Sequence, residues 1–373
     1  MNILYDATPL LMRSAGVKNY HHALLRHLIP NIAPHTLRLF PFLPALTANH
    51  NDQSNYPGRD TALRLGGILA SNYLGLPLAH LAARNVDLFH VTPHIWRVPH
   101  RVCLTAMIHD PTPALMPEVH TASNVRYFRR FMAKTARHLD GILVPSEAVK
   151  RDLVQHLPVS EQQIFVAPHG VDEDFFEATP AAIEMARRTY GLPANYILTV
   201  GSLEPRKNMS RLIEAFHKLP ERLRRQYPLV ITGASGWKDR DLRNLAASSA
   251  QVHLTGYVRR RLLPAVYHEA SLFAFPSLYE GFGLPLLEAM AARLPVVASN
   301  RSAIPEVVGD AGLLVDPLNV EKMASTIERV LVHADEAAAL GEAAYHQARR
   351  FSWKITAAAT KAFFETIYGR AGA

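Results

Sequence analysis

The sequence predicts an α/β protein built from two doubly wound domains, each with a parallel sheet between layers of helices. The chain has 373 residues, which is too many for one ordinary hydrophobic core. It opens with a strand-like run at Asn2–Asp6, a glycine loop and an amphipathic helix, which is the usual start of a doubly wound domain. A second unit of strand, loop and helix begins at Tyr196–Val200, so we expect a second domain of the same kind.

Short apolar runs predict the other strands. Runs of this length are typical of strands that are buried on both faces of a parallel sheet. In the first half of the chain they are Leu37–Phe42, Val86–Val91, Arg101–Ile108, Gly141–Val144 and Ile164–Ala167. In the second half they are Leu229–Thr232, Val252–Thr255, Ser271–Phe275 and Pro295–Ser299.

The most informative stretch runs from Pro276 to Ala289 and reads PSLYEGFGLPLLEA. It follows the expected strand Ser271–Phe275 and leads into an apolar helix, Leu284–Ala292. The turn between them therefore lies at the carboxyl end of a parallel strand, which is where open α/β sheets bind their ligands.

The residues of this turn suit a polyol. Gly281 and Gly283 let the backbone approach a ligand closely, and the free amides at the helix start favour hydroxyl oxygens or anions. Glu280 and Glu288 lie on either side of the turn, so both can face one pocket. A carboxylate accepts two hydroxyl hydrogens at once. The alternative is that they are a turn residue and an exposed helix residue without a ligand.

Glu280 and Glu288, with seven residues between them inside this string, resemble the signature of retaining, nucleotide-sugar-dependent glycosyltransferases of family 4 (group 1). The resemblance implies the GT-B architecture, two Rossmann-like domains that face each other across a cleft. It implies an acceptor domain over residues 1–172, a donor domain over 173–351 and a C-terminal helix, 352–373, that crosses back to the first domain. It places Glu288 at the nucleotide ribose. The donor sugar is implied to contact Glu280, Gly281, Phe282, Gly283 and Leu284.

The expected strand Tyr196–Val200 leads into a loop, GSLEPRKN, with two adjacent cations. Arg206 can bind a phosphate through two parallel hydrogen bonds, and Lys207 adds a point charge. Both suit a departing diphosphate, on which charge develops as the glycosidic bond breaks. The family has an Arg-Lys pair here for this role, beside Gly201 and Ser202. Many members carry arginine where this chain has Ser202, so the share of each cation stays open, and a solvent-exposed basic turn is the alternative.

Three further residues enter through the resemblance. Gly16 stands in the glycine loop after the first strand, which in the family lies beside the donor phosphates; a turn glycine without a ligand is the alternative. His109 follows the strand Arg101–Ile108, where the family has a histidine near the reacting sugar, and a neutral imidazole can donate to or accept from a hydroxyl. Val258 follows the strand near the nucleobase, which is often contacted through backbone atoms.

We expect no metal and no cofactor beyond the nucleotide-sugar donor. His109 and Asp110 form a pair without further ligands at suitable spacing. Asp239 and Asp241 resemble a metal-binding Asp-x-Asp motif, but we interpret them as the acidic first turn of a helix.

The net charge of +8 fits an anionic partner, either a nucleotide-sugar diphosphate, an anionic lipid surface or nucleic acid. Nucleic acid is not expected, because zinc-finger and aromatic RNA-binding signatures are missing from the sequence. The helix Asn124–His138 is basic and amphipathic and could lie on an anionic membrane; a solvated helix face is the alternative. Leu65–Ala83 has no charged residue, but Pro77 would break a spanning helix, so we expect a buried helix and a turn.

The single cysteine, Cys103, fits a reducing compartment, and the first strand begins at residue 2, so no signal peptide is expected. We therefore expect a cytoplasmic protein, with docking to the inner face of the plasma membrane left open.

The expected reaction is transfer of a hexosyl group, with retention, to a saccharide or lipid-linked saccharide. The GSLEPRKN loop is similar to bacterial mannosyltransferases of surface polysaccharide assembly, so GDP-mannose is the first donor expected. UDP-glucose or UDP-N-acetylglucosamine is the alternative donor. A phosphorylase or an epimerase on the same scaffold and a non-catalytic nucleotide-sugar-binding protein also stay open.

Overall fold

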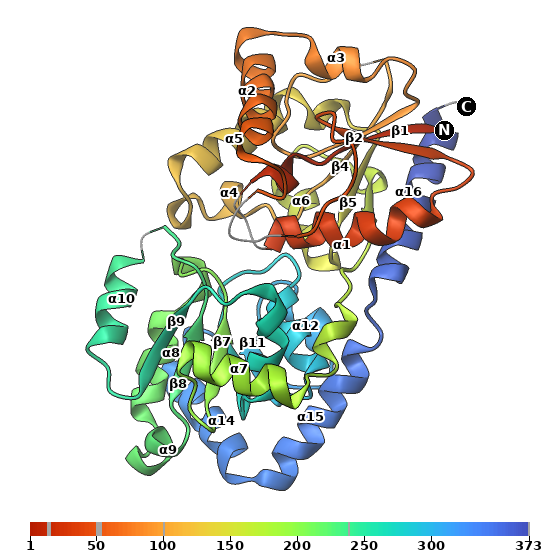
Figure 1. The fold of residues 1–373 in the computed structure, drawn as a ribbon. Helices are drawn as coiled ribbons and strands as arrows, with labels where there is room; N and C mark the ends of the chain where they lie inside the picture. Colours follow the sequence, from red (N-terminus) through yellow and green to blue (C-terminus); the bar gives the residue numbers. More distant parts are fainter. Residues whose placement is uncertain (13–15, 50–53, 100, 238, 372–373) are drawn as a thin grey trace. The chain divides into compact units, whose positions relative to one another are not determined.

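The chain forms two α/β units, coloured along the sequence in Figure 1. The computed structural model describes residues 1–12, 16–49, 54–99, 101–237 and 239–371. One unit comprises Met1–Gly170 together with Trp353–Ala373, and the other comprises Val171–Ser352. Within the described residues, each unit contains a six-stranded sheet, and every recorded strand pairing is parallel.

The first unit has the strand order β2-β1-β3-β4-β5-β6. Its strands are β1 (Asn2–Asp6), β2 (Thr36–Phe40), β3 (Leu88–Val91), β4 (Cys103–Met107), β5 (Gly141–Val144) and β6 (Ile164–Val166). Its α-helices are α1 (Gly16–Asn31), α2 (Gly58–Leu74), α3 (Leu78–Ala82), α4 (Thr112–Leu115), α5 (Ala122–Lys134), α6 (Glu147–His156) and α16 (Trp353–Ala371).

Successive residues of these strands point to opposite faces of the sheet, and both faces are covered. Leu4 of β1 and Phe89 of β3 belong to one core cluster, which α5 and α6 complete. The other face is covered by α1 and α16, which lie side by side although they are far apart in the sequence (Figure 1). The helix α6 begins as expected, because the Ser146 hydroxyl accepts a hydrogen bond of 3.2 Å from the Val149 amide.

The second unit has the strand order β12-β11-β10-β7-β8-β9. Its strands are β7 (Ile197–Val200), β8 (Leu229–Thr232), β9 (Val252–Gly256), β10 (Leu272–Phe275), β11 (Val296–Ser299) and β12 (Leu313–Val315). Its α-helices are α7 (Pro180–Tyr190), α8 (Met209–Lys218), α9 (Glu221–Gln226), α10 (Arg240–Ala247), α11 (Leu263–His268), α12 (Leu284–Ala291), α13 (Ile304–Val308), α14 (Val320–Val332) and α15 (Ala334–Ala348).

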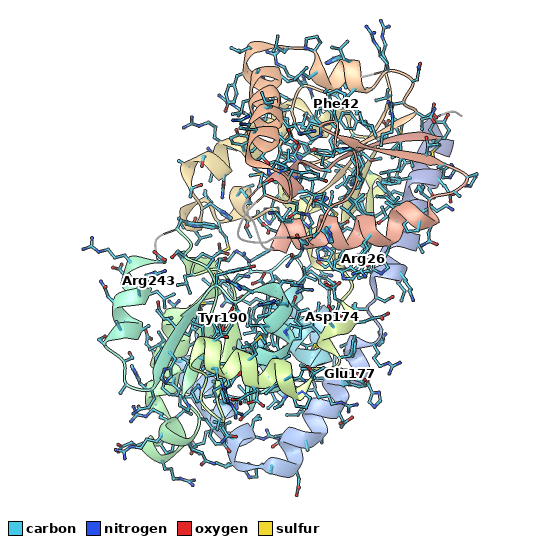
Figure 2. The ribbon with its side chains drawn as sticks, in the orientation of Figure 1. Arg26, Phe42, Asp174, Glu177, Tyr190 and Arg243 are labelled. Atoms are coloured by element: carbon cyan, nitrogen blue, oxygen red, sulfur yellow. The ribbon has the colours of Figure 1, made fainter. Side chains whose placement is uncertain are left out.

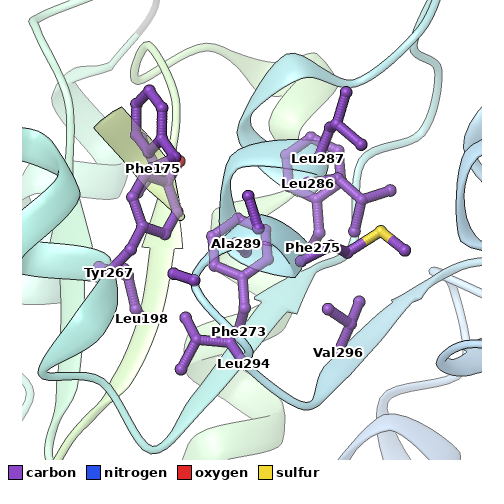
Figure 3. Close-up of a cluster of buried hydrophobic side chains, with 14 of the residues drawn as sticks. Phe175, Leu198, Tyr267, Phe273, Phe275, Leu286, Leu287, Ala289, Leu294 and Val296 are labelled. Carbon is purple, nitrogen blue, oxygen red and sulfur yellow. The ribbon is translucent and has the colours of Figure 1, made fainter. Parts of the chain in front are cut away.

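The strand β10 shows why this sheet is apolar along its whole length. Phe273 and Phe275 pack with α11, α12 and α15 on one face, as the close-up in Figure 3 shows for part of the cluster. Leu272 and Ala274, between them in the sequence, pack with α8 and α14 on the other face. A strand that is buried on both sides needs an apolar residue at every position.

The strands expected from the sequence are present, with ends that differ by at most two residues. The expectation of a buried helix within Leu65–Ala83 is wrong. The helix α2 buries only Ile68, Ser71 and Asn72, while Leu74 is 80% exposed; Leu63, in the same helix but before this stretch, is 75% exposed. These leucines are exposed because a helix on the outside of a sheet buries only one stripe of its side chains.

Other large apolar side chains around α2 are also exposed. They include Phe42, which is labelled in Figure 2 and follows β2, together with Leu69, Tyr73, Leu76 and Leu81. Across the described ranges, none of the helices combines the length and the apolar character that a membrane crossing requires.

Candidate functional site

The loops that carry the two sequence motifs lie beside each other in the second unit. The chain moves from β7 to β8 in one direction along the sheet, and from β10 to β11 in the other. Since β7 and β10 are neighbours, the strand order reverses between them. Ligands of open α/β sheets bind at such a reversal, outside the carboxyl ends of the strands.

Glu280 forms the centre of a buried ion cluster at this point. Its Oε1 lies 2.7 Å from Lys207 Nζ, and its Oε2 lies 3.1 Å from Arg206 Nη1. The Glu280 amide donates a hydrogen bond of 2.8 Å to Ser302 Oγ. Burial alone would raise the pKa of Glu280, but Lys207 and Arg206 outweigh it and lower the pKa to about 2. Glu280 is therefore an ionised acceptor over the whole physiological pH range.

Arg206 is held by groups that the sequence interpretation did not include. Its Nη2 donates to Glu204 Oε1 at 2.6 Å, and its Nη1 also donates to the Tyr279 carbonyl at 2.6 Å. The Glu204 side chain is 2% exposed. Arg206 and Lys207 were expected as two cations available to a phosphate. The structure instead balances them with Glu204 and Glu280, and the signal for Glu204 was its place two residues before Arg206.

The absence of a side chain at Gly201 leaves room for the Lys207 side chain. A Cβ at Gly201 would lie 3.3 Å from Lys207 Cε, which is tighter than an ordinary carbon contact. Ser202, the next residue, is half-buried, and its carbonyl accepts a hydrogen bond of 2.8 Å from the Glu204 amide. Glycine therefore lets the lysine lie along the backbone on its way to Glu280.

Asn208 ties three loops together. Its φ of 58° lies in the left-handed region, which asparagine tolerates better than most residues. Its Nδ2 donates to the carbonyls of Pro276, at 3.1 Å, and Pro317, at 2.7 Å.

The turn between Glu280 and α12 is buried. Gly281, Phe282 and Gly283 are all buried, and the ring centroids of Phe282 and Phe351 are 5.7 Å apart. Gly283 has a φ of 104°, which L side chains rarely adopt, and it precedes the first helical residue, Leu284. The glycine is thus required by the backbone where the chain turns into the helix.

Glu288 lies one turn into α12 and forms a second buried cluster. Its Oε1 accepts from Arg260 Nη1 at 3.0 Å, and its Oε2 accepts from the Tyr267 hydroxyl at 2.9 Å. Burial raises the pKa of Glu288, and Arg260 and Tyr267 offset part of this rise. Arg260 also pairs with Asp172. Val258, the residue expected near the nucleobase, is buried two positions before Arg260.

Gly16 and His109 belong to the first unit. Gly16 is the first residue of α1, and a Cβ there would meet nothing within 4 Å; Ser14, in the same loop, lies outside the described residues. His109 follows β4, and its ring is 4.6 Å from the ring of Tyr20. Burial lowers the pKa of His109 to about 4, so the imidazole is neutral. Among the described residues, its buried Nε2 has no hydrogen-bond partner.

The structure thus brings Arg206, Lys207 and Glu280 into direct contact and gives Glu288 its own partners. Groups of three or more histidine, cysteine, aspartate or glutamate side chains that could hold a metal are not found among the residues that the structure describes. Asp239 precedes α10, where its carboxylate pairs with Arg243 at 2.8 Å.

The helix α5 carries a basic surface that lines a cavity of about 580 Å³. The cations of this surface are Arg126, Arg129, Arg130 and Lys134. Within the described part of the chain, none of them is paired with a carboxylate. The Arg130 guanidinium lies 5.0 Å from the centre of the Tyr73 ring, which connects α5 to α2.

Family models match both halves of the chain. The model described as glycosyl transferases group 1 covers residues 184–347, and the one described as glycosyltransferase family 4 covers residues 15–175. The O-antigen chain mannosyltransferase B of Escherichia coli is 31% identical over 372 residues, which span 95% of this chain and 97% of that protein.

Solved structures share the fold. The sucrose-phosphate synthase of Thermosynechococcus elongatus superposes with a TM-score of 0.76 at 19% identity, covering 99% of this chain and 100% of the other. HepE of Anabaena, solved in complex with UDP-glucose, gives a TM-score of 0.71 at 20% identity, with 99% and 100% covered. Together with the two parallel sheets, these likenesses confirm the GT-B fold. The chain belongs to the group 1, family 4 glycosyltransferases and is a hexose-transferring enzyme.

Proposed function

We propose that the enzyme transfers a mannosyl group from GDP-mannose to a saccharide or lipid-linked saccharide, with retention of the anomeric configuration. The observation that carries this proposal is the pairing of Glu280 with Lys207 and Arg206 where the strand order reverses. It sets an acceptor for sugar hydroxyls directly beside cations for a diphosphate. The mannosyl donor is supported by the similarity to an O-antigen mannosyltransferase over nearly the whole chain.

The ion cluster must rearrange when the donor binds. Lys207 has three ammonium hydrogens, and the structure directs one of them to Glu280 at 2.7 Å. Its other donors can reach a phosphate oxygen while Glu280 turns one lone pair to a sugar hydroxyl. Arg206 stays oriented by Glu204 and the Tyr279 carbonyl, so it meets the phosphate with little loss of conformational entropy.

In the proposed reaction, the bond between the sugar C1 and the phosphate oxygen breaks as the acceptor hydroxyl attacks from the same face. The acceptor proton passes to the leaving phosphate oxygen, so no protein base is needed. Arg206 and Lys207 stabilise the charge that develops on that oxygen. We propose no metal ion and no organic cofactor, because these two cations supply the charge compensation.

We propose the remaining roles from family membership. Glu288 is proposed to hold the nucleotide ribose, with backbone atoms near Val258 at the base. Gly201, Ser202 and the turn Gly281–Leu284 line the donor. Gly16 is proposed beside the donor phosphates and His109 beside the reacting sugar, where its neutral ring can donate or accept.

The acceptor end of the reaction is proposed to lie at an anionic membrane surface. The basic surface of α5 and the exposed leucines of α2 lie in one unit and are linked through Arg130 and Tyr73. Cations beside exposed apolar side chains are the pattern of a surface that rests on anionic lipid headgroups. Vesicles of phosphatidylglycerol should therefore bind the protein, and the double variant Arg126→Glu/Arg129→Glu should abolish this binding. Equal binding to phosphatidylcholine vesicles would contradict the proposal.

The donor is tested by thermal shift with GDP-mannose, UDP-glucose, UDP-N-acetylglucosamine, GDP and UDP. A ligand at 100 times its Kd stabilises the folded protein by about 2.7 kcal/mol. We expect the guanine ligands to raise the Tm, and Lys207→Gln to shrink that rise. The exposed Lys218→Gln is the matched control and should leave it unchanged. Mannosyl transfer from GDP-mannose to a saccharide extract should then be followed by mass spectrometry.

A UDP-sugar is the second candidate donor, because HepE was solved with UDP-glucose and has the same fold. A Tm rise with the uridine ligands alone would establish it and overturn GDP-mannose. If none of the ligands shifts the Tm at millimolar concentration, the nucleotide-sugar site itself is wrong.

A further inference from the structure

Arg260 occupies an unusual position for a residue in a basic run. It begins the 3-10 turn η7 (Arg260–Leu262), between exposed Arg259 and Arg261. Its own guanidinium is turned inward, with the side chain 24% exposed. A guanidinium keeps its charge when it is buried, so this inward orientation needs a compensating partner.

Three groups hold the guanidinium in place. Nη1 donates to Glu288 Oε1 at 3.0 Å, and Nη2 donates to a carboxylate oxygen of Asp172. Its carbon lies 4.5 Å from the centre of the Phe175 ring. Phe175 in turn lies against Tyr267, at 5.6 Å between ring centroids, and Figure 3 shows the two rings together. These three contacts hold the Arg260 guanidinium beside the Glu288 carboxylate of α12.

The same contacts define which part of Glu288 remains for a ligand. An ionised carboxylate has about four acceptor positions on its two oxygens. Arg260 takes one position on Oε1, and the Tyr267 hydroxyl takes one on Oε2. The described residues supply no other hydrogen bond to this carboxylate, so one position per oxygen is left for a ligand, which matches the two neighbouring hydroxyls of a ribose.

We propose that Arg260 is a positioning residue for Glu288, and that it thereby sets the preference of the enzyme for nucleotides whose ribose carries both free hydroxyls. This inference rests on the proposed role of Glu288 at the ribose. Arg260 does not touch the nucleotide. It fixes one oxygen of the carboxylate and opposes the rise in the pKa of Glu288 that burial causes, while Asp172 holds the guanidinium in this orientation.

The test compares the Kd of GDP and UDP with that of their 2′,3′-dideoxy counterparts by isothermal titration calorimetry. Hydrogen bonds to a charged acceptor are strong, so the wild type should bind the ribonucleotide about 10- to 100-fold more tightly than the dideoxy form. In Arg260→Gln, this ratio should fall to about threefold or less. Arg260→Lys keeps the charge but not the planar fork, and should restore part of the ratio.

Two further variants separate positioning from general structural damage. Asp172→Asn should lower the ratio less than Arg260→Gln does, because an amide oxygen at this position can still accept from the guanidinium, which itself remains beside Glu288. Arg261→Gln, one position along and exposed, should leave the ratio as in the wild type. In Arg260→Gln, the ratio should also rise between pH 6 and 8.5, because a buried carboxylate without its cation has a raised pKa and becomes a full acceptor only at higher pH.

The results distinguish this inference from the proposed function. If the wild type prefers the ribonucleotide and Arg260→Gln keeps that preference while weakening both ligands equally, Arg260 has only a structural role and the inference is overturned. If the wild type binds the dideoxy and ribose forms equally, the role of Glu288 is wrong as well. If neither GDP nor UDP binds, the proposed function fails together with the inference.

Discussion

The buried histidines of the first unit should make it sensitive to acid. His90 in β3 is fully buried, with its Nδ1 at 3.0 Å from Thr105 Oγ1 and its ring centroid 5.1 Å from those of Tyr5 and Phe364. Burial, together with the nearby His109, lowers the pKa of His90 to about 3. The unfolded chain takes up a proton near pH 6.5, whereas the folded protein does not until about pH 3.

Proton uptake determines whether the free energy of unfolding rises or falls with pH. Between pH 6.5 and 3 the unfolded state binds more protons than the folded state, so the free energy of unfolding rises with pH and falls on acidification. At pH 5, about 1.5 units below the histidine pKa in the unfolded chain, the loss due to His90 is about 2 kcal/mol at 1.36 kcal/mol per unit. Burial also lowers the pKa values of His21 and His169, so the total loss should be larger.

The perturbation is His90→Gln, whose amide can keep the contact with Thr105 but cannot be protonated. Its cost at pH 7.5, of about 1–3 kcal/mol, reflects the altered packing of a buried site. Between pH 7.5 and 5, however, the variant should lose about 2 kcal/mol less than the wild type. The control His80→Gln replaces an exposed ring in α3 and should lose as much as the wild type.

Urea unfolding at the two pH values measures these free energies. In a Trp237→Phe background, fluorescence reports on the first unit alone, since Trp96 and Trp353 are both buried there. The reasoning is refuted if wild type and His90→Gln lose the same free energy between pH 7.5 and 5.

The remaining predictions follow from local geometry. Glu204→Gln should lower kcat about 10- to 100-fold with little loss of donor affinity, measured by steady-state kinetics, because it removes the carboxylate that orients Arg206, which we propose stabilises the transition-state charge. Gly233→Ala should lower the free energy of unfolding by about 2–4 kcal/mol in urea unfolding, because its Cβ would lie 1.8 Å from the Gly201 carbonyl oxygen. Gly66→Ala, in open space within α2, should instead raise the free energy of unfolding by about 0.5–1 kcal/mol. Donor binding, measured by calorimetry, should not weaken between pH 8 and 5 through Glu280, because Lys207 and Arg206 hold its pKa at about 2; a loss that Glu280→Gln removes would contradict this assignment.

The fold could be predicted well from the sequence because strands that are buried on both faces leave a clear signal. The run Ser271–Phe275 has no polar interruption after Ser271, and the structure buries both faces of β10. The prediction of a buried helix at α2 is wrong because an uncharged sequence shows only that burial is possible. Whether Leu63 and Leu74 find neighbours depends on which elements lie beyond them, and the sequence pattern does not contain that information.

The candidate site was predicted only in part. The motif located Glu280, Glu288 and the cationic loop, but not what each side chain contacts. Arg260 was one of three consecutive arginines, and only the backbone turn of η7 decides which of them points inward. Ion pairs between segments far apart in the sequence, such as Arg260 with Asp172, depend on tertiary packing rather than on local spacing.

The helix α16 has a consequence for how the protein is synthesised. It supplies Ile367 and Phe363, whose side chains would lie within 3 Å of a Cβ at Gly141 in β5, and its Thr356 hydroxyl donates to the Pro168 carbonyl. The first unit therefore stays incomplete on the ribosome until the last helix has emerged, whereas every residue of the second unit has been made by then. Domains usually fold in the order of translation. In this chain, the unit that is translated first should be the last to reach its native packing.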